Sequence, residues 1–195
     1  MCESKSFTLW LLQVVVLLGL LAFFLWLMLH PKAPTYTIVG FSVPVPNNGS
    51  NTTTAGQGYD QNGSLTFYLE IKNPNKDSSV YYDDILLTFY YNQDTVGERT
   101  LPSFHQDKDK TSQFIDKVDA NARVWKTLGK AIANKTAEVK VDLVTKFRYN
   151  MWGRTSKHHG MNLQGRVPIG SDGKISGKKK IKLRKGFKKL RLKVT

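Results

Sequence analysis

Two pairs of adjacent polar residues are the first candidates for chemistry in this sequence. Asp83 and Asp84 are neighbouring carboxylates, and two close carboxylates can act as a general acid and base. His158 and His159 are neighbouring imidazoles of the kind that bind metal ions. Adjacent strand residues point to opposite faces, so the aspartates need not act together, and a turn or strand edge is the favoured interpretation. The histidines, which lack a second ligand cluster, are expected in a solvated basic loop.

The sequence holds few other candidates for catalysis. His105 lies in a polar stretch and has no serine or cysteine nearby that it could activate as a nucleophile. There is no phosphate-binding glycine loop, no HExxH pattern and no CxxC pattern. We therefore expect a protein that is not an enzyme and that has no cofactor and no metal site.

A cluster of cations near the C-terminal end is the strongest candidate for binding. The net charge is +14, and removing the ten cations of residues 178–195 leaves 19 basic against 15 acidic residues, or +4. Apolar residues alternate with the cations, which predicts a strand with a basic face; an amphipathic helix and a solvated tail are the alternatives. An anionic surface would bind through Lys178, Lys179, Lys180, Lys182, Arg184, Lys185, Lys188, Lys189, Arg191 and Lys193.

Residues 7–29 form the element that determines whether these side chains lie beside a membrane. They carry no charge, and as a helix they would reach roughly 34 Å, enough to cross a hydrocarbon core of about 30 Å. Trp10 and Trp26 lie near the two ends, where indole rings favour the membrane interface. The segment is longer than a signal-peptide core and lacks a small-residue cleavage site, so a retained transmembrane helix is favoured over a cleaved signal.

The orientation of this helix is predicted from four glycosylation triplets, because the flanking charges are nearly equal. All four triplets follow the helix, beginning at Asn48, Asn51, Asn62 and Asn134, and they favour an exoplasmic domain. Residues 1–6 then form a short cytosolic tail. Cys2 is the single cysteine; it is a candidate for S-acylation or simply a free thiol, and it leaves the domain without a disulfide.

Residues 35–177 have the pattern of a β domain, preceded by a Pro-rich linker at 30–34. Short alternating segments and frequent turn signals predict a mainly β fold, an immunoglobulin-like or fibronectin-like antiparallel β-sandwich. One short helix is expected at 120–133. The stretches 47–63 and 102–110 are expected to be loops, and the strands are expected at 35–45, 64–72, 80–82, 85–91, 96–101, 111–118, 137–149 and 161–167.

Three sequence blocks resemble a known plant family. The first is NPN at 73–75 followed by VYYD at 80–83, the second is LPSFHQ at 101–106, and the third is the strand 141–149 leading into Trp152-Gly153. They are similar to the group-2 late embryogenesis abundant (WHy) domain, and in particular to the membrane-anchored harpin-induced and non-race-specific disease resistance protein-like family. The residues matched to the motif, to which we assign a structural role, are Asn73, Pro74, Asn75, Tyr81, Tyr82, Asp83, Pro102, Phe104 and Gln106.

The resemblance implies a role in plant defence or stress responses at the cell surface, without known chemistry. The expected location is the plasma membrane, with the endoplasmic reticulum or plasmodesmata as alternatives. The expected partner is an unidentified protein, and a homo- or hetero-oligomer is also open. An alternative function is a structural tether from the membrane to the wall or to a second membrane. Its basic tail would then bind acidic cell-wall polysaccharide or anionic lipid; nucleic acid fits the charge but not an exoplasmic location.

Overall fold

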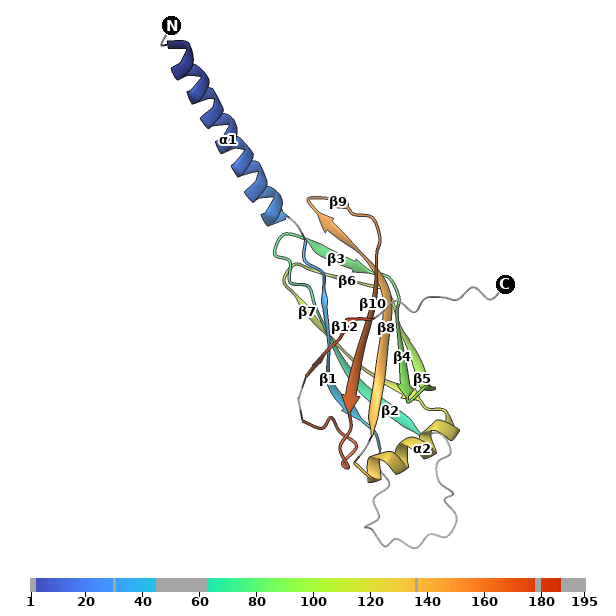
Figure 1. Ribbon diagram of the computed structural model, residues 1–195. Helices are drawn as coiled ribbons and strands as arrows, with labels where there is room; N and C mark the ends of the chain where they lie inside the picture. The colour runs from blue at the N-terminus through green and yellow to red at the C-terminus, as the bar shows by residue number, and fades with distance from the viewer. Residues whose placement is uncertain (1–2, 30, 45–62, 136, 178–179, 187–195) are drawn as a thin grey trace, which may run out of the picture. The chain divides into compact units, whose positions relative to one another are not determined.

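The computed structural model describes residues 3–29, 31–44, 63–135, 137–177 and 180–186. The chain divides into two compact units, Met1–Lys32 and Ala33–Thr195. We call the second unit the β domain. Helix α1 (Glu3–Leu29) belongs to the first unit, and helix α2 (Ala122–Ala133) belongs to the β domain (Figure 1). The described strands are β1 (Thr35–Ser42), β2 (Ser64–Lys72), β3 (Ser79–Tyr82), β4 (Ile85–Tyr91), β5 (Asp94–Leu101), β6 (Phe104–Gln106), β7 (Thr111–Asp119), β8 (Glu138–Met151), β9 (Arg154–Thr155), β10 (His159–Pro168), β11 (Ile181–Lys182) and β12 (Arg184–Lys185).

From Phe7 to Leu29, helix α1 has no charged residue and no polar face. Its window Phe7–Phe24 has a mean hydropathy of 2.4, and none of it is buried against protein. A helix without a polar stripe cannot place one face on a core and the other in water. By length and composition, α1 is able to cross a membrane.

Two antiparallel sheets build the β domain, which confirms the predicted mainly β class. The smaller sheet has the order β11-β1-β2-β7. The larger sheet has the order β12-β10-β8-β3-β6, while β4 and β9 also pair with β8, and β5 pairs with β4. Every pairing in both sheets is antiparallel between the described strands.

Strand β8 is the centre of the larger sheet. One edge pairs with β10 from Phe147↔His159 to Glu138↔Pro168. The other edge pairs first with β4 and then with β3, along successive parts of its length. The predicted interruption at Asp83 and Asp84 therefore separates two strands that follow each other along one edge of β8.

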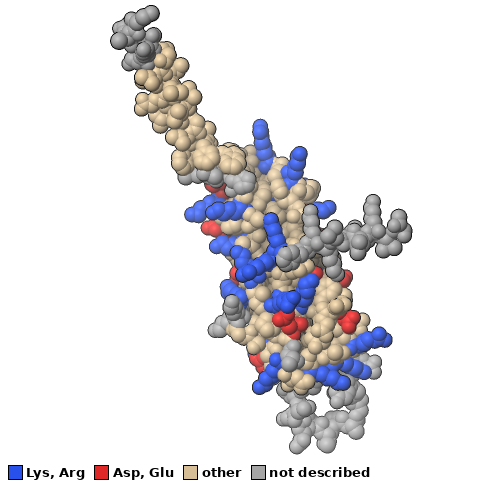
Figure 2. Space-filling model, viewed as in Figure 1, with Lys and Arg blue, Asp and Glu red and all other residues tan. Residues whose placement is uncertain are grey.

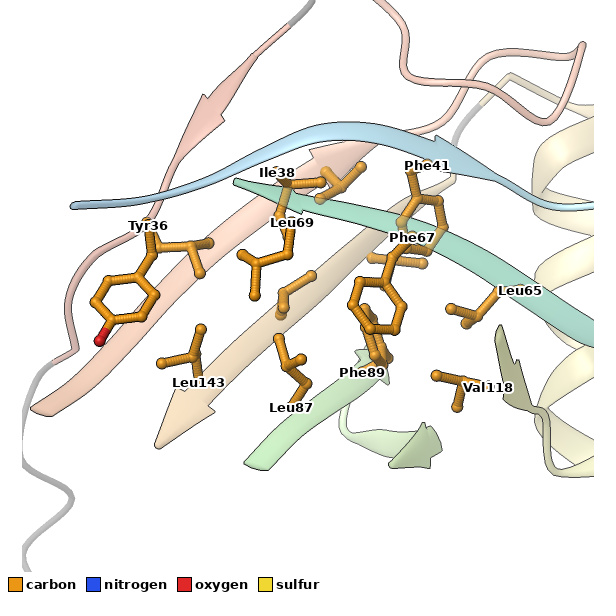
Figure 3. Close-up of a cluster of buried hydrophobic side chains, with 14 of the residues drawn as sticks. Tyr36, Ile38, Phe41, Leu65, Phe67, Leu69, Leu87, Phe89, Val118 and Leu143 are labelled. Atoms are coloured by element: carbon orange, nitrogen blue, oxygen red, sulfur yellow. The ribbon is translucent and has the colours of Figure 1, made fainter. Parts of the chain in front are cut away.

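The core lies between the two sheets, and aromatic rings meet at its centre. Figure 3 shows Phe67 of β2 and Phe89 of β4 pointing toward one another, with ring centroids 5.3 Å apart. Phe41 of β1 packs against the same Phe89 ring, with ring centroids 6.0 Å apart. The alternation predicted for β2 is observed, since its inward side chains are fully buried: Leu65, Phe67, Leu69 and Ile71.

Helix α2 begins two residues later than expected and packs on the core by one face. Asn121 caps its first turn, because its side-chain oxygen accepts a hydrogen bond from the Arg123 backbone N–H at 3.0 Å. Val124, Leu128 and Ile132, spaced four residues apart, are buried. This spacing places all three on the side of the helix that faces the sheets.

One region differs from the sequence-based expectation. The stretch 102–110 is predicted to be a loop, but it contains β6, which pairs with β3. Residues 181–185 belong to the basic run for which a strand is predicted, with a helix or a solvated tail as alternatives, and here β11 pairs with β1 and β12 pairs with β10. We call residues 181–185 the edge segment, because it adds a short strand to an edge of each sheet.

Candidate functional site

The buried amide of Asn73 joins two loops at one end of the β domain. Its Nδ2 donates hydrogen bonds to the carbonyl oxygens of Ser78 (2.9 Å) and Asp107 (3.0 Å). Its Oδ1 accepts hydrogen bonds from the backbone N–H (3.1 Å) and Nδ2 (2.9 Å) of Asn75. In addition, its own backbone N–H donates to the Lys110 carbonyl at 2.9 Å. The first motif residue therefore fixes the β2–β3 loop against the β6–β7 loop.

A second polar link, made by Tyr82 and Gln106, connects the two sheets. The Tyr82 hydroxyl donates to Gln106 Oε1 at 2.8 Å. Gln106 Nε2 in turn donates to the Ile71 carbonyl and to Ser112 Oγ, each at 2.9 Å. Ile71 and Ser112 belong to the smaller sheet, whereas Tyr82 and Gln106 belong to the larger one. Buried polar groups that are fully paired in this way favour one arrangement of the sheets.

The remaining motif residues surround this link. Phe104 stacks on Tyr82 with centroids 4.5 Å apart. Pro74 is half-buried in the β2–β3 loop, and Pro102 is exposed between β5 and β6. Tyr81 lies on the outer face, and its ring centroid is 4.4 Å from that of His105. Most of the predicted motif residues thus lie in or beside the core rather than on an open surface.

Burial suppresses ionisation of three tyrosines near this link. It raises the pKa of Tyr149 to about 12 and raises the pKa of Tyr36 and of Tyr82 still further. Removal from water is the main cause, since it disfavours the charged phenolate, and mutual repulsion between phenolates adds to it. These hydroxyls therefore remain neutral at physiological pH.

The two members of the aspartate pair contact different groups, and so do the two members of the histidine pair. Asp83 Oδ2 lies 3.5 Å from His158 Nε2. Asp84 Oδ1 instead accepts a hydrogen bond from the Ser103 backbone N–H at 2.9 Å. The His159 ring packs against the Phe147 ring, with ring centroids 5.6 Å apart. Within the described residues, no three His, Cys, Asp or Glu side chains lie close enough together to hold a metal ion.

Four cations of the predicted basic run fall on the described residues. Lys180 Nζ lies 3.6 Å from Glu70 Oε2. Lys182, Arg184 and Lys185 are exposed in β11 and β12. They lie on either side of Leu183, which is only 3% exposed. The other predicted cations lie outside the described residues: Lys178, Lys179, Lys188, Lys189, Arg191 and Lys193.

One of the predicted modification sites, Asn134, lies among the described residues. Asn134 is the C-cap residue of α2 and is exposed, so its side chain is accessible from solvent. Cys2, Asn48, Asn51 and Asn62 lie outside the described residues.

The sequence pattern predicts for Trp152 only a place in a turn. In the structure its side chain is 76% exposed, and its backbone φ of +51° is unusual for a large residue. A Trp-Gly pair between two alternating segments is the sequence signal that marks it. A shallow hollow of about 390 Å³, lined by Gly40, Tyr68 and Lys174 among others, lies elsewhere on the surface.

The family model described as late embryogenesis abundant protein matches residues 68–165, half of the chain. That range includes the Asn73 and Gln106 networks, and the chain belongs to this family, as the motif resemblance predicted. Protein NDR1 of Arabidopsis thaliana is 30% identical over 189 residues, which cover 89% of this chain and 80% of that protein. NDR1/HIN1-like protein 26 of the same plant is 33% identical over 88 residues, covering 45% of this chain and 39% of the relative.

Solved structures resemble the chain only distantly. The solution structure of an Arabidopsis thaliana protein covers 72% of this chain and 85% of its own, with 11% identity and a TM-score of 0.43. That likeness is too weak to support an argument about function.

Proposed function

We propose that this protein is a single-pass membrane protein that acts in plant defence or stress responses at the cell surface. Its exoplasmic β domain acts by binding, without catalysis. The observation that carries the proposal is the relationship to Protein NDR1, which covers 89% of the chain. The β domain, Ala33–Thr195, is too short to supply that share by itself. The similarity therefore extends into the unit that contains α1.

The arrangement of the β domain supports a binding role. The motif residues Asn73, Tyr82 and Gln106 use their polar atoms to hold loops and sheets together, which leaves the outer faces for an unidentified protein partner or a further copy of the chain. The two packed antiparallel sheets also support an immunoglobulin-like or fibronectin-like sandwich, a scaffold whose loops and faces commonly bind other proteins.

A membrane extraction combined with a glycosidase assay tests the anchor and the orientation. We expect the expressed protein to stay in the membrane pellet at alkaline pH in carbonate, because α1 is long and apolar enough to span the bilayer. We also expect glycosidase to increase its mobility. The variant N48Q/N51Q/N62Q/N134Q should migrate like the deglycosylated protein. Release by carbonate would contradict the anchor, and an unshifted band would contradict the exoplasmic β domain.

A membrane-to-wall or membrane-to-membrane tether is the second candidate function, in which the basic run binds acidic polysaccharide or anionic lipid. Exposed Lys182, Arg184 and Lys185 on the edge segment favour it. Truncation at residue 178 would not test it cleanly, because the buried Leu183 would be lost as well.

Charge neutralisation is therefore the better test of the tether. We expect K182Q/R184Q/K185Q to reduce binding to immobilised polygalacturonate and to weaken its salt dependence, because exposed charges are screened by salt. The variant R123Q/K126Q/K130Q, which removes three exposed cations from α2, is the matched control. Equal losses from both variants would show that binding depends on net charge and not on the edge segment.

A further inference from the structure

The turn between β8 and β9 carries a residue that the fold itself does not favour. Met151 pairs with Arg154, so Trp152 and Gly153 form a two-residue hairpin turn. Both have positive φ, +51° and +74°. Such turns favour Asn-Gly, because a β-carbon and a bulky side chain are strained in this region. Trp152 is nevertheless present and 76% exposed, so its indole is not explained by packing within the β domain.

The chain around this turn is basic. Between Asp142 and Asp172 there are five Lys or Arg residues and no carboxylate. Arg154 and Lys157 are the first two cations that follow Trp152 in sequence, and both are exposed. Among the described residues, the ion pairs involve neither of them, and the Asp83 carboxylate lies beside His158 instead. The turn therefore combines an exposed indole with two cations that have no acidic partner in the described part of the chain.

The β8–β9 turn lies at the end of the β domain where the chain enters. Tyr36 near the start of β1 packs against Tyr82, with ring centroids 6.3 Å apart, and Tyr82 pairs with Phe147 of β8. At the other end of β1, Phe41 packs against Phe89, which pairs with Val141. The two strands thus run in opposite directions. Residues before Tyr36 and residues just after Phe147 therefore lie at the same end of the β domain, which we call the entry end.

The linker that leads into the entry end is short. Leu29 ends α1 and Thr35 begins β1. The six Cα steps between them reach at most about 22 Å when fully extended. If α1 crosses a bilayer, this covalent limit holds the entry end close to the headgroup layer whatever path the linker takes. Figures 1 and 2, which share one view, show basic side chains projecting from the part of the β domain that includes β9.

We propose that the β8–β9 turn is a membrane-docking element for the bilayer that holds α1. The Trp152 indole enters the headgroup region, and Arg154 and Lys157 contact lipid phosphates. This inference rests on the proposed membrane anchoring. Indole rings favour the interface because they have a large apolar body and one N–H donor, while guanidinium and ammonium groups form charge-assisted hydrogen bonds with phosphate.

A lipid surface fits this turn better than a protein partner. The short covalent link presents headgroups to the turn at high effective concentration, so contacts that would be weak between free molecules can form. A strained position occupied by an exposed aromatic residue is also typical of a residue kept for function rather than stability.

Site-directed spin labelling of the full chain in vesicles tests this proposal. Cys2→Ser provides a cysteine-free background, and Thr155→Cys places a nitroxide in β9 beside the turn. Gln93→Cys places the control label in the exposed β4–β5 turn at the opposite end, since Tyr91 lies beside Val139 near the start of β8. In phosphatidylcholine vesicles with and without phosphatidylglycerol, we expect the label at 155 to be several-fold less accessible to a water-soluble nickel relaxant than the label at 93.

Two variants identify the groups responsible. Trp152→Asn should abolish the protection at 155 while raising the unfolding temperature, because asparagine suits this turn. R154Q/K157Q should reduce the protection, and more so in vesicles that contain phosphatidylglycerol. A merely structural role for Trp152 would instead make Trp152→Asn destabilising. A rise in stability together with lost protection therefore separates docking from folding.

The outcomes that overturn docking differ from those that overturn anchoring. If the labelled chain leaves the vesicles in carbonate, the anchor is wrong and the docking proposal fails with it. If the chain stays with the vesicles but the labels at 155 and 93 are equally accessible to nickel, anchoring stands and docking alone is wrong. Unchanged protection in Trp152→Asn would likewise overturn the role assigned to the indole.

Discussion

Asn73 shows how a single side chain can hold two loops together. Both of its amide hydrogens and its oxygen are used, and every partner is backbone or the neighbouring Asn75. Aspartate has almost the same shape but lacks both N–H donors, and it would bury a charge. The position therefore requires an amide rather than any small polar residue.

Replacing this amide should destabilise the β domain strongly. We expect Asn73→Ala to lower its free energy of unfolding by about 3 kcal/mol, because several buried groups lose their partners together. Asn73→Asp should be at least as damaging. The measurement is thermal unfolding of the detergent-solubilised full chain, followed by near-ultraviolet circular dichroism. Gln93→Ala, in an exposed turn, should change stability by less than about 0.5 kcal/mol, and a similarly small effect at Asn73 would contradict the role described.

At the scale of elements, the edge segment joins the two sheets along one side of the β domain. Ile181 pairs with β1, Arg184 pairs with β10, and the backbone N–H of Leu183 between them donates to the Tyr36 carbonyl at 2.9 Å. The Leu183 side chain is buried over Gly165 of β10, where a β-carbon would lie only 2.5 Å from its Cδ2. The absence of a side chain at 165 therefore makes room for this leucine.

The glycine in β10 provides a direct test of this packing. We expect Gly165→Ala to destabilise the β domain by about 1–3 kcal/mol, because the new methyl group displaces Leu183. Gly160→Ala, in the same strand, has no neighbouring atom within 4 Å and should be nearly neutral. Thermal unfolding compares the two variants. If the clash is the cause, the double variant G165A/L183A should lose less stability than the sum of the losses from Gly165→Ala and Leu183→Ala. A loss equal to that sum would show that the clash is not the cause.

For the molecule as a whole, the three buried tyrosines predict the behaviour of the β domain at alkaline pH. In the unfolded chain their pKa returns to the ordinary value of 10.0, whereas in the folded domain it is raised, to about 12 for Tyr149 and further for Tyr36 and Tyr82. Above pH 10 the unfolded state therefore binds fewer protons than the folded state. The free energy of unfolding should be unaffected by these groups below pH 10 and should fall between pH 10 and 12.

Tyrosinate absorbance measures this effect directly. We expect the exposed tyrosines to ionise first on titration, and the three buried ones to ionise only as near-ultraviolet circular dichroism reports unfolding. Tyr68, which lies at the surface, provides the contrast: Tyr68→Phe should remove amplitude from the early phase, and Tyr149→Phe should remove it from the late phase. Removal of early amplitude by Tyr149→Phe would show that its hydroxyl is not shielded from water.

Local patterns in the sequence determined a large part of this molecule. The unbroken apolar run predicted a long uniform helix, and strict alternation at 64–72 and 137–149 predicted β2 and β8, because side-chain periodicity is set by the backbone of each element. The family was also predictable, since it depends on motif letters such as NPN at 73–75.

Only the tertiary structure decided which of these residues act together. Part of 102–110 is strand β6 because it pairs with β3, and the edge segment pairs with both sheets. No local pattern specifies such partners. Burial made Asn73, Tyr82 and Gln106 part of a link between loops and sheets. The opposed directions of β1 and β8 brought Trp152 to the entry end. Each of these outcomes depends on contacts between residues far apart in the chain, which spacing along the sequence does not encode.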